Sequence, residues 1–298
     1  MIKVADLRRK TSENLIILLG FFDCLHIGHR AVLDRAFKEA EKQSATVGML
    51  TFKDGFGYNI GRSGKSVFTF KERIDKAERL GVSTVLYAKF DEKFKNLSPE
   101  EFISLIDKNH NVKGFVCGYD FTYGKGGEGN AEVLRKTCEK LGVELSVVER
   151  QEFSGEKIST SLIKKHLEEG NIEVSNELLG EPYYLTGKVV RGRQFGRKIG
   201  FPTANINIPK YKMPIKDGVY ATHTVIGGKS YKGITNYGAR PTFSLDKKLT
   251  ETYLLDFDGD LYGEEITVYF DKYLRPIEKY SGAEALKKRL TEDLESVK

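Results

Sequence analysis

A short aliphatic run followed at once by a glycine-containing turn constrains the fold of this chain most. Residues 15–19 read LIILL, which predicts a buried strand, and residues 20–29 read GFFDCLHIGH. From Val32 onward the apolar residues recur at helical spacing, so a helix is expected to begin near Gly28. A strand, a turn and a helix in this order predict the opening of an α/β fold.

The turn carries two imidazoles, His26 and His29, on either side of Gly28. The unpaired N–H groups at the start of a helix attract phosphate, and glycine lets backbone come close to a ligand. Both histidines can donate hydrogen bonds to charge that develops on a phosphate during transfer. The alternative is a pair of ordinary surface histidines, but the complete HxGH pattern at a strand-to-helix turn favours a nucleotide site.

Strand and helix patterns alternate through the first part of the chain. The segments that predict buried strands are residues 15–19, 45–52, 84–87, 115–117 and 144–148. The segments that predict helices are residues 70–80, 99–109, with Ser98 as N-cap, and 131–141. This alternation predicts a doubly wound parallel sheet, whose ligands bind at the carboxyl ends of its strands.

The pattern changes near residue 180, after two short helical segments at 160–169 and 173–179. Short alternating runs rich in Gly, Tyr, Thr and Val then follow at residues 184–190, 218–225, 231–236, 252–257 and 265–270. Five or six such strands predict a small antiparallel barrel, against which an amphipathic helix at 283–297 is expected to pack. We therefore expect two domains, residues 1–180 and 181–298.

Composition limits the compartment and the partners. No segment of the 298 residues approaches the ~18 uninterrupted apolar residues of a membrane span, and the charged first ten residues do not resemble a secretory signal. We expect a cytoplasmic protein without a membrane partner. The net charge of +6 fits anionic small ligands, and the chain has no basic stripe that would predict nucleic acid as a partner. The sequence sets no oligomeric state.

Three cysteines, Cys24, Cys117 and Cys138, occur without metal-ligand spacing between them. An odd number of cysteines without such spacing predicts neither a disulfide framework nor a zinc site. Cys24 lies within the histidine turn, where an inert small side chain is favoured over a reactive thiol.

The second domain has its own candidate site in the segment GRQFGRKIGFPTAN, residues 192–205. Its glycines and cations suit a polyphosphate, because backbone approaches it and positive charge offsets it. A hydroxyl at Thr203 and an amide oxygen at Asn205 lie on one face of an extended segment and suit Mg²⁺. The alternative is a glycine-rich hairpin with solvated arginines.

A carboxylate at Glu251 is the candidate base of this second site. It opens a predicted strand that runs to Phe257, after a turn at residues 236–242. A carboxylate beside a bound hydroxyl can accept its proton as that oxygen attacks a γ-phosphate. Without Thr203 and Asn205 nearby, Glu251 would be an ordinary surface glutamate at the end of a strand.

These segments occur in the order of a known family. GFFDCLHIGHR, GYDF at residues 118–121, KISTSLIKKHLEEGNIEVSNELLG, GRKIGFPTANI, DGVYA, NYGARPTF and LDFDGDLYGEEITVYF follow one another along the chain. Over nearly its whole length the chain resembles the bacterial bifunctional riboflavin kinase/FMN adenylyltransferases, also called FAD synthetases. The resemblance implies a Rossmann-like nucleotidyltransferase domain followed by a riboflavin-kinase-like β-barrel with a C-terminal helix.

The resemblance also implies two ATP-dependent reactions. In the second module, Mg²⁺ and ATP phosphorylate riboflavin to FMN, with Glu251 as base and with Thr203 and Asn205 as the magnesium residues. In the first module, FMN attacks the α-phosphorus of a second ATP and gives FAD and pyrophosphate, with His26 and His29 stabilising the phosphates. The residues implied in binding cofactor and substrates are Gly20, Phe22, Asp23, Gly28, Asp120, Ser159, Thr160, Ser161, Lys164, Arg193, Arg197, Gly200, Pro202, Thr203, Asn205 and Arg275, the last through a phosphate or the flavin ring.

The chain departs from the family pattern in its first module. A TFxPHP-like segment is expected after the second strand, but residues 51–57 read TFKDGFG, and Lys164 stands where the family has an arginine. Lysine keeps the charge and loses the bidentate geometry. Residues 55–66 are rich in glycine and carry cations, and the sequence is equally compatible with a rebuilt flavin or phosphate loop and with slow, altered or lost adenylyl transfer. Two alternatives remain, a kinase with a silent first module and a non-catalytic regulator that binds flavin or RNA.

Overall fold

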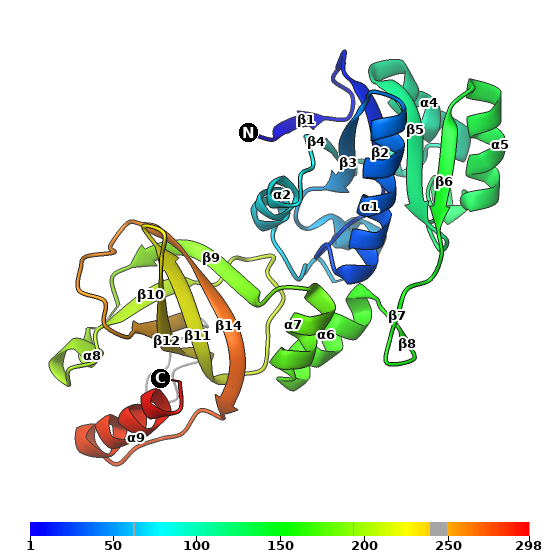
Figure 1. Cartoon of the computed structure of the whole chain (residues 1–298). Helices are drawn as coiled ribbons and strands as arrows, with labels where there is room; N and C mark the ends of the chain where they lie inside the picture. Colours follow the sequence, from blue (N-terminus) through cyan, green and yellow to red (C-terminus); the bar gives the residue numbers. More distant parts are fainter. Residues whose placement is uncertain (62, 193, 239–248, 298) are drawn as a thin grey trace. The chain divides into compact units, whose positions relative to one another are not determined.

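The computed structural model describes residues 1–61, 63–192, 194–238 and 249–297 (Figure 1). The chain forms two compact units, Met1–Thr160 and Ser161–Lys298. This division falls after the first residue of α6 (Thr160–Glu169) and before α7 (Ile172–Leu179), whereas the sequence places the boundary after both helices. The reason is packing, because α7 lies against two strands of the second unit.

The first unit contains a six-stranded, wholly parallel sheet in the order β1-β4-β3-β2-β5-β6. Its strands are β1 (Lys3–Asp6), β2 (Asn14–Leu19), β3 (Thr46–Phe52), β4 (Thr84–Ala88), β5 (Asn111–Gly118) and β6 (Glu144–Val148). The doubly wound prediction is confirmed. The sequence missed β1, a short edge strand with exposed or half-buried residues and therefore no aliphatic run.

Helices cover both faces of this sheet, because the residues of β2 alternate between two cores. Leu15, Ile17 and Leu19 belong to a core that includes residues of α4 and α5, whereas Ile16 and Leu18 belong to one that includes residues of α1 and α2. The helices and short turns of this unit are α1 (Ile27–Lys42), η1 (Phe56–Ile60), α2 (Phe70–Arg79), α3 (Glu92–Lys95), α4 (Pro99–Asn109), η2 (Lys125–Gly127) and α5 (Ala131–Leu141). A small hairpin, β7 (Glu152–Phe153) and β8 (Glu156–Lys157), follows β6.

Capping residues set the helix starts that the sequence predicted. Ser98 and Thr69 each accept a hydrogen bond from the backbone N–H three residues on, and the carboxylates of Glu101 and Glu72 each accept one from the backbone N–H of the capping residue. Both ends are complete capping boxes, which typically stabilise a helix by about 1 kcal/mol. Among the described helices none is long and apolar enough to cross a membrane.

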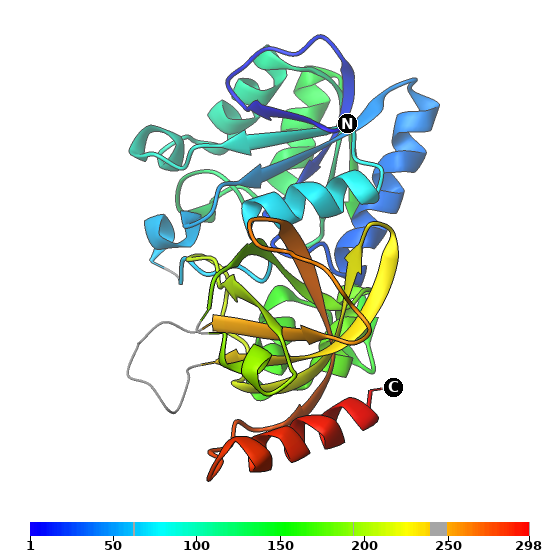
Figure 2. The same ribbon diagram turned by 90° about the vertical axis from the view of Figure 1, so that its left-hand side faces the viewer.

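The second unit is built on a closed antiparallel barrel in the order β10-β13-β12-β11-β14-β9, as predicted (Figure 2). Its strands are β9 (Tyr183–Val190), β10 (Thr203–Asn207), β11 (Gly218–Ile226), β12 (Lys229–Gly238), β13 (Leu249–Leu254) and β14 (Glu265–Arg275). β13 ends before residues 255–257, which the sequence placed in the strand, because Asp256 adopts a left-handed conformation with φ 56°. A four-residue helix, α8 (Phe195–Lys198), precedes β10.

The last helix, α9 (Ala283–Glu295), packs against the barrel as the amphipathic pattern predicted (Figure 2). Leu294 joins a small core with Phe201, Val219 and Ile234 of the barrel, and Leu290 packs against it. The helix therefore covers apolar side chains that the barrel would otherwise expose.

Candidate functional sites

The histidine turn lies at the carboxyl end of β2, where it begins α1. Phe22 and Leu25 both adopt left-handed conformations, with φ 49° and 47°, which fold the turn back on itself. His26 is the N-cap of α1, and its Nδ1 accepts a hydrogen bond from the backbone N–H of His29 at 3.1 Å. The two imidazole rings stack with their centroids 3.6 Å apart. The predicted helix start is confirmed, with a histidine as its capping residue.

Burial keeps both imidazoles neutral near pH 7. Burial, and then the charge of Lys76, lower the pKa of His26 to about 4. Burial is also the main cause that lowers the pKa of His29 well below its usual range. The Nζ of Lys76 donates a hydrogen bond to the carbonyl oxygen of Cys24 at 2.9 Å. The histidines therefore meet an incoming phosphate as neutral hydrogen-bonding groups, and Lys76 contributes positive charge beside the turn.

Other predicted residues support this turn. A Cβ on Gly20 would approach the Phe22 ring to 2.9 Å, and that ring lies edge-on to His29 with centroids 5.1 Å apart. A Cβ on Gly28 would lie 3.2 Å from the His26 ring, so glycine leaves that ring its space. The buried Asp23 accepts a hydrogen bond from the backbone N–H of Val67 at 2.9 Å, which ties the turn to the segment before α2.

The remaining predicted residues of the first module lie outside the turn itself. Thr160 Oγ1 lies 3.9 Å from Cys24 Sγ, which brings the start of α6 to the turn, and Ser159 precedes it. Asp120 forms an ion pair with Lys157. Ser161 and Lys164 lie on α6 within the second compact unit.

A cavity of about 720 Å³ opens beside the same turn, and half of the residues that line it are aromatic. Phe52 and Phe56 stack with centroids 4.5 Å apart, and Phe90 meets both rings edge-on. Gly20 and Phe21 also line the cavity, so it adjoins the histidine turn directly. Phe56 belongs to the rebuilt segment after β3, where the family's histidine and proline are missing. That segment therefore contributes an aromatic wall.

Arg73, a residue that sequence reasoning missed, holds this wall in place. Its guanidinium is fully buried and donates to Thr51 Oγ1 at 2.5 Å, to the carbonyl oxygen of Phe52 at 2.8 Å and to Asp54 Oδ1 at 3.3 Å. The guanidinium also lies over the Phe21 ring, 4.9 Å from its centroid. A lone arginine on an amphipathic helix gives no sequence signal for this role, because the groups that accept these three hydrogen bonds lie about 20 residues away along the chain.

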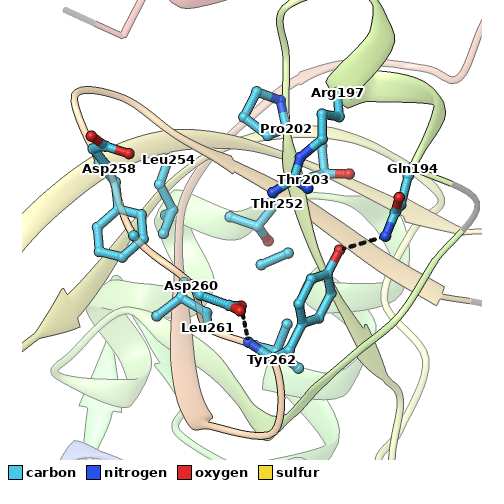
Figure 3. A pocket seen from close by; sticks show the side chains of 14 residues that line it. Gln194, Arg197, Pro202, Thr203, Thr252, Leu254, Asp258, Asp260, Leu261 and Tyr262 are labelled. Carbon is cyan, nitrogen blue, oxygen red and sulfur yellow. Dashed lines mark hydrogen bonds between the residues drawn. The ribbon is translucent and has the colours of Figure 1, made fainter.

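Two pockets lie on the barrel. The first, of about 310 Å³, is lined by Gln194, Arg197, Pro202, Thr203 and the loop after β13 (Figure 3). Gln194 Nε2 donates to the hydroxyl of Tyr262 at 3.3 Å across this pocket. Of the other two predicted residues of the segment, Gly200 is exposed with φ 87°, and Arg193 lies outside the described residues.

The second pocket, of about 260 Å³, contains the predicted base. Glu251 lies in the middle of β13, opposite Asn205 of β10 and Asn236 of β12, rather than at the start of a strand as expected. Asn205 and Glu251 line this pocket together with apolar side chains that include Tyr253 and Leu290. Thr203 and Gln194 line both pockets. The structure therefore brings Thr203, Asn205 and Glu251 together where the two pockets meet.

The amide of Asn205 is fixed by its surroundings. It is 4% exposed, and its Nδ2 donates to the carbonyl oxygen of Thr203 at 3.2 Å. A Cβ on Gly192 would come within 2.7 Å of this amide, so only glycine allows the loop to pass so close. Hydroxyl, amide and carboxylate oxygens are the donors that Mg²⁺ prefers, and this cluster therefore fits that ion.

Arg275 is held differently from what the resemblance implied. It lines the second pocket, but its guanidinium donates to Asp293 of α9 through Nε at 3.0 Å and through Nη2 at 2.7 Å. Both side chains are buried, at 6% and 5% exposure. Because the planar fork is occupied by the Asp293 carboxylate, Arg275 fastens α9 to the end of β14.

These two sites define a class of protein. The start of a helix at the carboxyl end of a parallel strand suits phosphate binding. An oxygen-rich cluster where two barrel pockets meet suits metal-assisted phosphoryl transfer. Together they indicate a two-module transferase that acts on phosphorylated small molecules.

Comparison with known proteins gives the family. A model described as FAD synthetase matches residues 8–162, and one described as riboflavin kinase matches residues 179–298. The bifunctional riboflavin kinase/FMN adenylyltransferase of Listeria monocytogenes is 35% identical, covering 95% of this chain and 91% of its own length. That of Bacillus subtilis is 34% identical, with coverages of 93% and 90%. This chain belongs to the family of bifunctional riboflavin kinase/FMN adenylyltransferases.

The fold comparison spans the entire molecule. A crystal structure described as a macrolide-efflux protein from Streptococcus pneumoniae matches with a TM-score of 0.89 at 28% identity, and covers 100% of this chain and 99% of its own. The family membership confirms the resemblance seen in the sequence. The protein is a transferase of flavin cofactor biosynthesis that uses ATP, riboflavin and FMN, and neither the kinase-only alternative nor the regulator is favoured.

Proposed function

We propose that riboflavin phosphorylation takes place where the two barrel pockets meet. The observation that carries this assignment is that Thr203 lines both pockets while Glu251 lies opposite Asn205 in the strand register. The first pocket, with Arg197 and backbone at its rim, suits the phosphates of ATP. The second is walled by apolar and aromatic side chains, which suit the flavin ring.

Proton transfer from riboflavin is assigned to Glu251. Its carboxylate accepts the proton of the 5′-hydroxyl as that oxygen attacks the γ-phosphorus of ATP, and ADP departs with the electron pair of the broken P–O bond. Mg²⁺, which Thr203 and Asn205 would hold, neutralises phosphate charge when it is bound. Positioning of the hydroxyl against the phosphate supplies most of the acceleration that the protein itself provides.

Adenylyl transfer is assigned to the histidine turn of the first unit. A phosphate oxygen of FMN attacks the α-phosphorus of a second ATP, and pyrophosphate leaves. The imidazoles of His26 and His29 offer ring N–H groups to these phosphates, beside the start of α1, which attracts negative charge, and the charge of Lys76. The adjoining aromatic cavity, walled by Phe52 and Phe56, has the size and apolar character to take the flavin ring.

Two variants test the separation of these sites. Glu251→Gln is expected to lower FMN formation from riboflavin by about 10²- to 10⁴-fold and to leave FAD formation from supplied FMN intact. His29→Ala is expected to do the reverse. Loss of both activities in either correctly folded variant would contradict the assignment of two independent sites.

A further inference from the structure

The histidine turn contains a cluster that phosphate binding does not explain. Cys24, His26 and His29 each offer one metal-binding atom, and these atoms lie within 4.8 Å of one another. All three residues come from a segment of six, so their proximity is set locally by the turn. One sulfur and two imidazole nitrogens form a ligand set for Zn²⁺ and its neighbours, whereas Mg²⁺ selects oxygen.

A buried nitrogen in this cluster points independently to a ligand. His29 Nδ1 is buried and has no hydrogen-bond partner within the described parts of the chain. A buried polar atom of this kind costs stability unless something binds it. His26 Nδ1 already accepts the N–H of His29, which leaves Nε2 as the atom that His26 can offer. Cys24 Sγ lies 3.9 Å from Thr160 Oγ1, a weak contact that a metal–sulfur bond would readily replace.

We propose that this turn is also a three-ligand Zn²⁺ site. The Cys24 thiol loses its proton to solvent when the thiolate binds the ion, and His26 and His29 bind as neutral imidazoles. Ligand atoms around a tetrahedral zinc lie roughly 3.3–3.7 Å apart, so the stacked rings must turn and the atoms close by about 1 Å. The fourth position is left to water or to a phosphate oxygen of a substrate.

Occupancy by zinc would switch off one module alone. The ion takes both histidines that the proposed adenylyl transfer requires, so this consequence rests on the function proposed above for the turn. The kinase residues belong to the other compact unit. The charge of Lys76, bound to the carbonyl oxygen of Cys24, opposes a second cation and favours reversible binding. Zinc is therefore expected to stop synthesis at FMN.

Cobalt provides a readout that is independent of activity. Titration of the metal-free full-length protein with Co²⁺ should give one bound ion per chain and a near-ultraviolet thiolate-to-cobalt absorption that Zn²⁺ abolishes. Cys24→Ser should lose this absorption and weaken Zn²⁺ binding by more than about tenfold. Cys138→Ser removes a buried thiol of the same unit and should keep both. Absence of the absorption, or its persistence in Cys24→Ser, would overturn the site.

Separate control experiments test whether each variant is folded and which of the two activities zinc affects. His29→Gln, which keeps a polar side chain, should also lose the cobalt absorption, and circular dichroism checks that each variant is folded. In the wild type, FAD formation from FMN should fall in proportion to zinc occupancy while FMN formation from riboflavin stays constant. Zinc that binds without slowing FAD formation would refute the switch. Metal-free protein that makes no FAD would instead refute the proposed adenylyl site, whatever the cobalt spectrum shows.

Discussion

Replacement of Asp293 by alanine is expected to release α9 from the barrel. The substitution leaves the guanidinium of Arg275 buried at 6% exposure without the carboxylate that accepts from its Nε and Nη2. Breaking a buried ion pair by removing one partner costs about 3–5 kcal/mol. At tenfold for each 1.4 kcal/mol, the opening equilibrium of α9 should rise by at least about a hundredfold.

Hydrogen exchange followed by mass spectrometry on the full-length protein measures how often α9 opens, from the exchange rates of peptides that cover residues 283–297. Glu292→Ala on the same helix is the matched control, because its side chain is 47% exposed and pairs only at the surface with Arg289. It should change stability by less than about 1 kcal/mol. The KM for riboflavin should rise in Asp293→Ala, because α9 supplies Leu286 and Leu290 to the pocket.

A double replacement separates the lost pair from the buried charge. Arg275→Met with Asp293→Leu should recover most of the protection, because it leaves neither charge behind. If Asp293→Ala exchanges like Glu292→Ala, the pair does not hold the helix, and Arg275 becomes available for the ligand contact that the family resemblance implied.

Three further predictions concern single side chains. The pKa of His26 is about 4 in the folded protein against about 6.5 in the unfolded chain, so the unfolded state binds more protons below pH 6.5 and the protein loses stability as the pH falls. Chemical denaturation should show that the wild type loses about 2 kcal/mol more stability between pH 7.5 and pH 5 than His26→Gln does. Equal losses would refute the shift. Gly192→Ala should lower the rate of FMN formation about tenfold, because the added Cβ displaces the Asn205 amide. Gly282→Ala is the control, because the space around its Cβ is open, and it should keep the rate. Equal rates for the two variants would contradict the close approach of Gly192 to Asn205. Arg73→Met should raise the KM for FMN in adenylyl transfer about tenfold because the cavity wall loosens, with riboflavin phosphorylation as the internal control; an unchanged KM would show that Arg73 serves stability alone.

Local patterns predicted most of the elements, because each is determined by a few neighbouring residues. The bounds of α4, α5, α6 and β6 agree with the prediction residue for residue. β1 was missed because it is an exposed or half-buried edge strand. The end of β13 was placed too late because the strand stops before a left-handed Asp256 rather than at a change of hydrophobicity. Periodicity detects neither feature.

The sites were predicted where motif residues are adjacent in sequence and missed where the fold assembles them. Thr203 and Asn205 share one strand, and the HxGH turn is contiguous, so both were identified. Arg73 and Asp293 act on partners from other elements, which no spacing reveals. The spacing of the cysteines likewise predicted no zinc site. The zinc site proposed at Cys24 combines one thiol with two histidines, so a search for closely spaced cysteines does not detect it.

The most direct test of the account is a chromatographic time course of the full-length protein with riboflavin and Mg-ATP, repeated from FMN. Two independent sites in one chain predict that FMN rises first and then declines as FAD accumulates, and that FAD forms without delay when FMN is supplied. FMN that accumulates without FAD in metal-free buffer supplemented only with Mg²⁺ would contradict an active histidine turn, and no product from either substrate would contradict both sites.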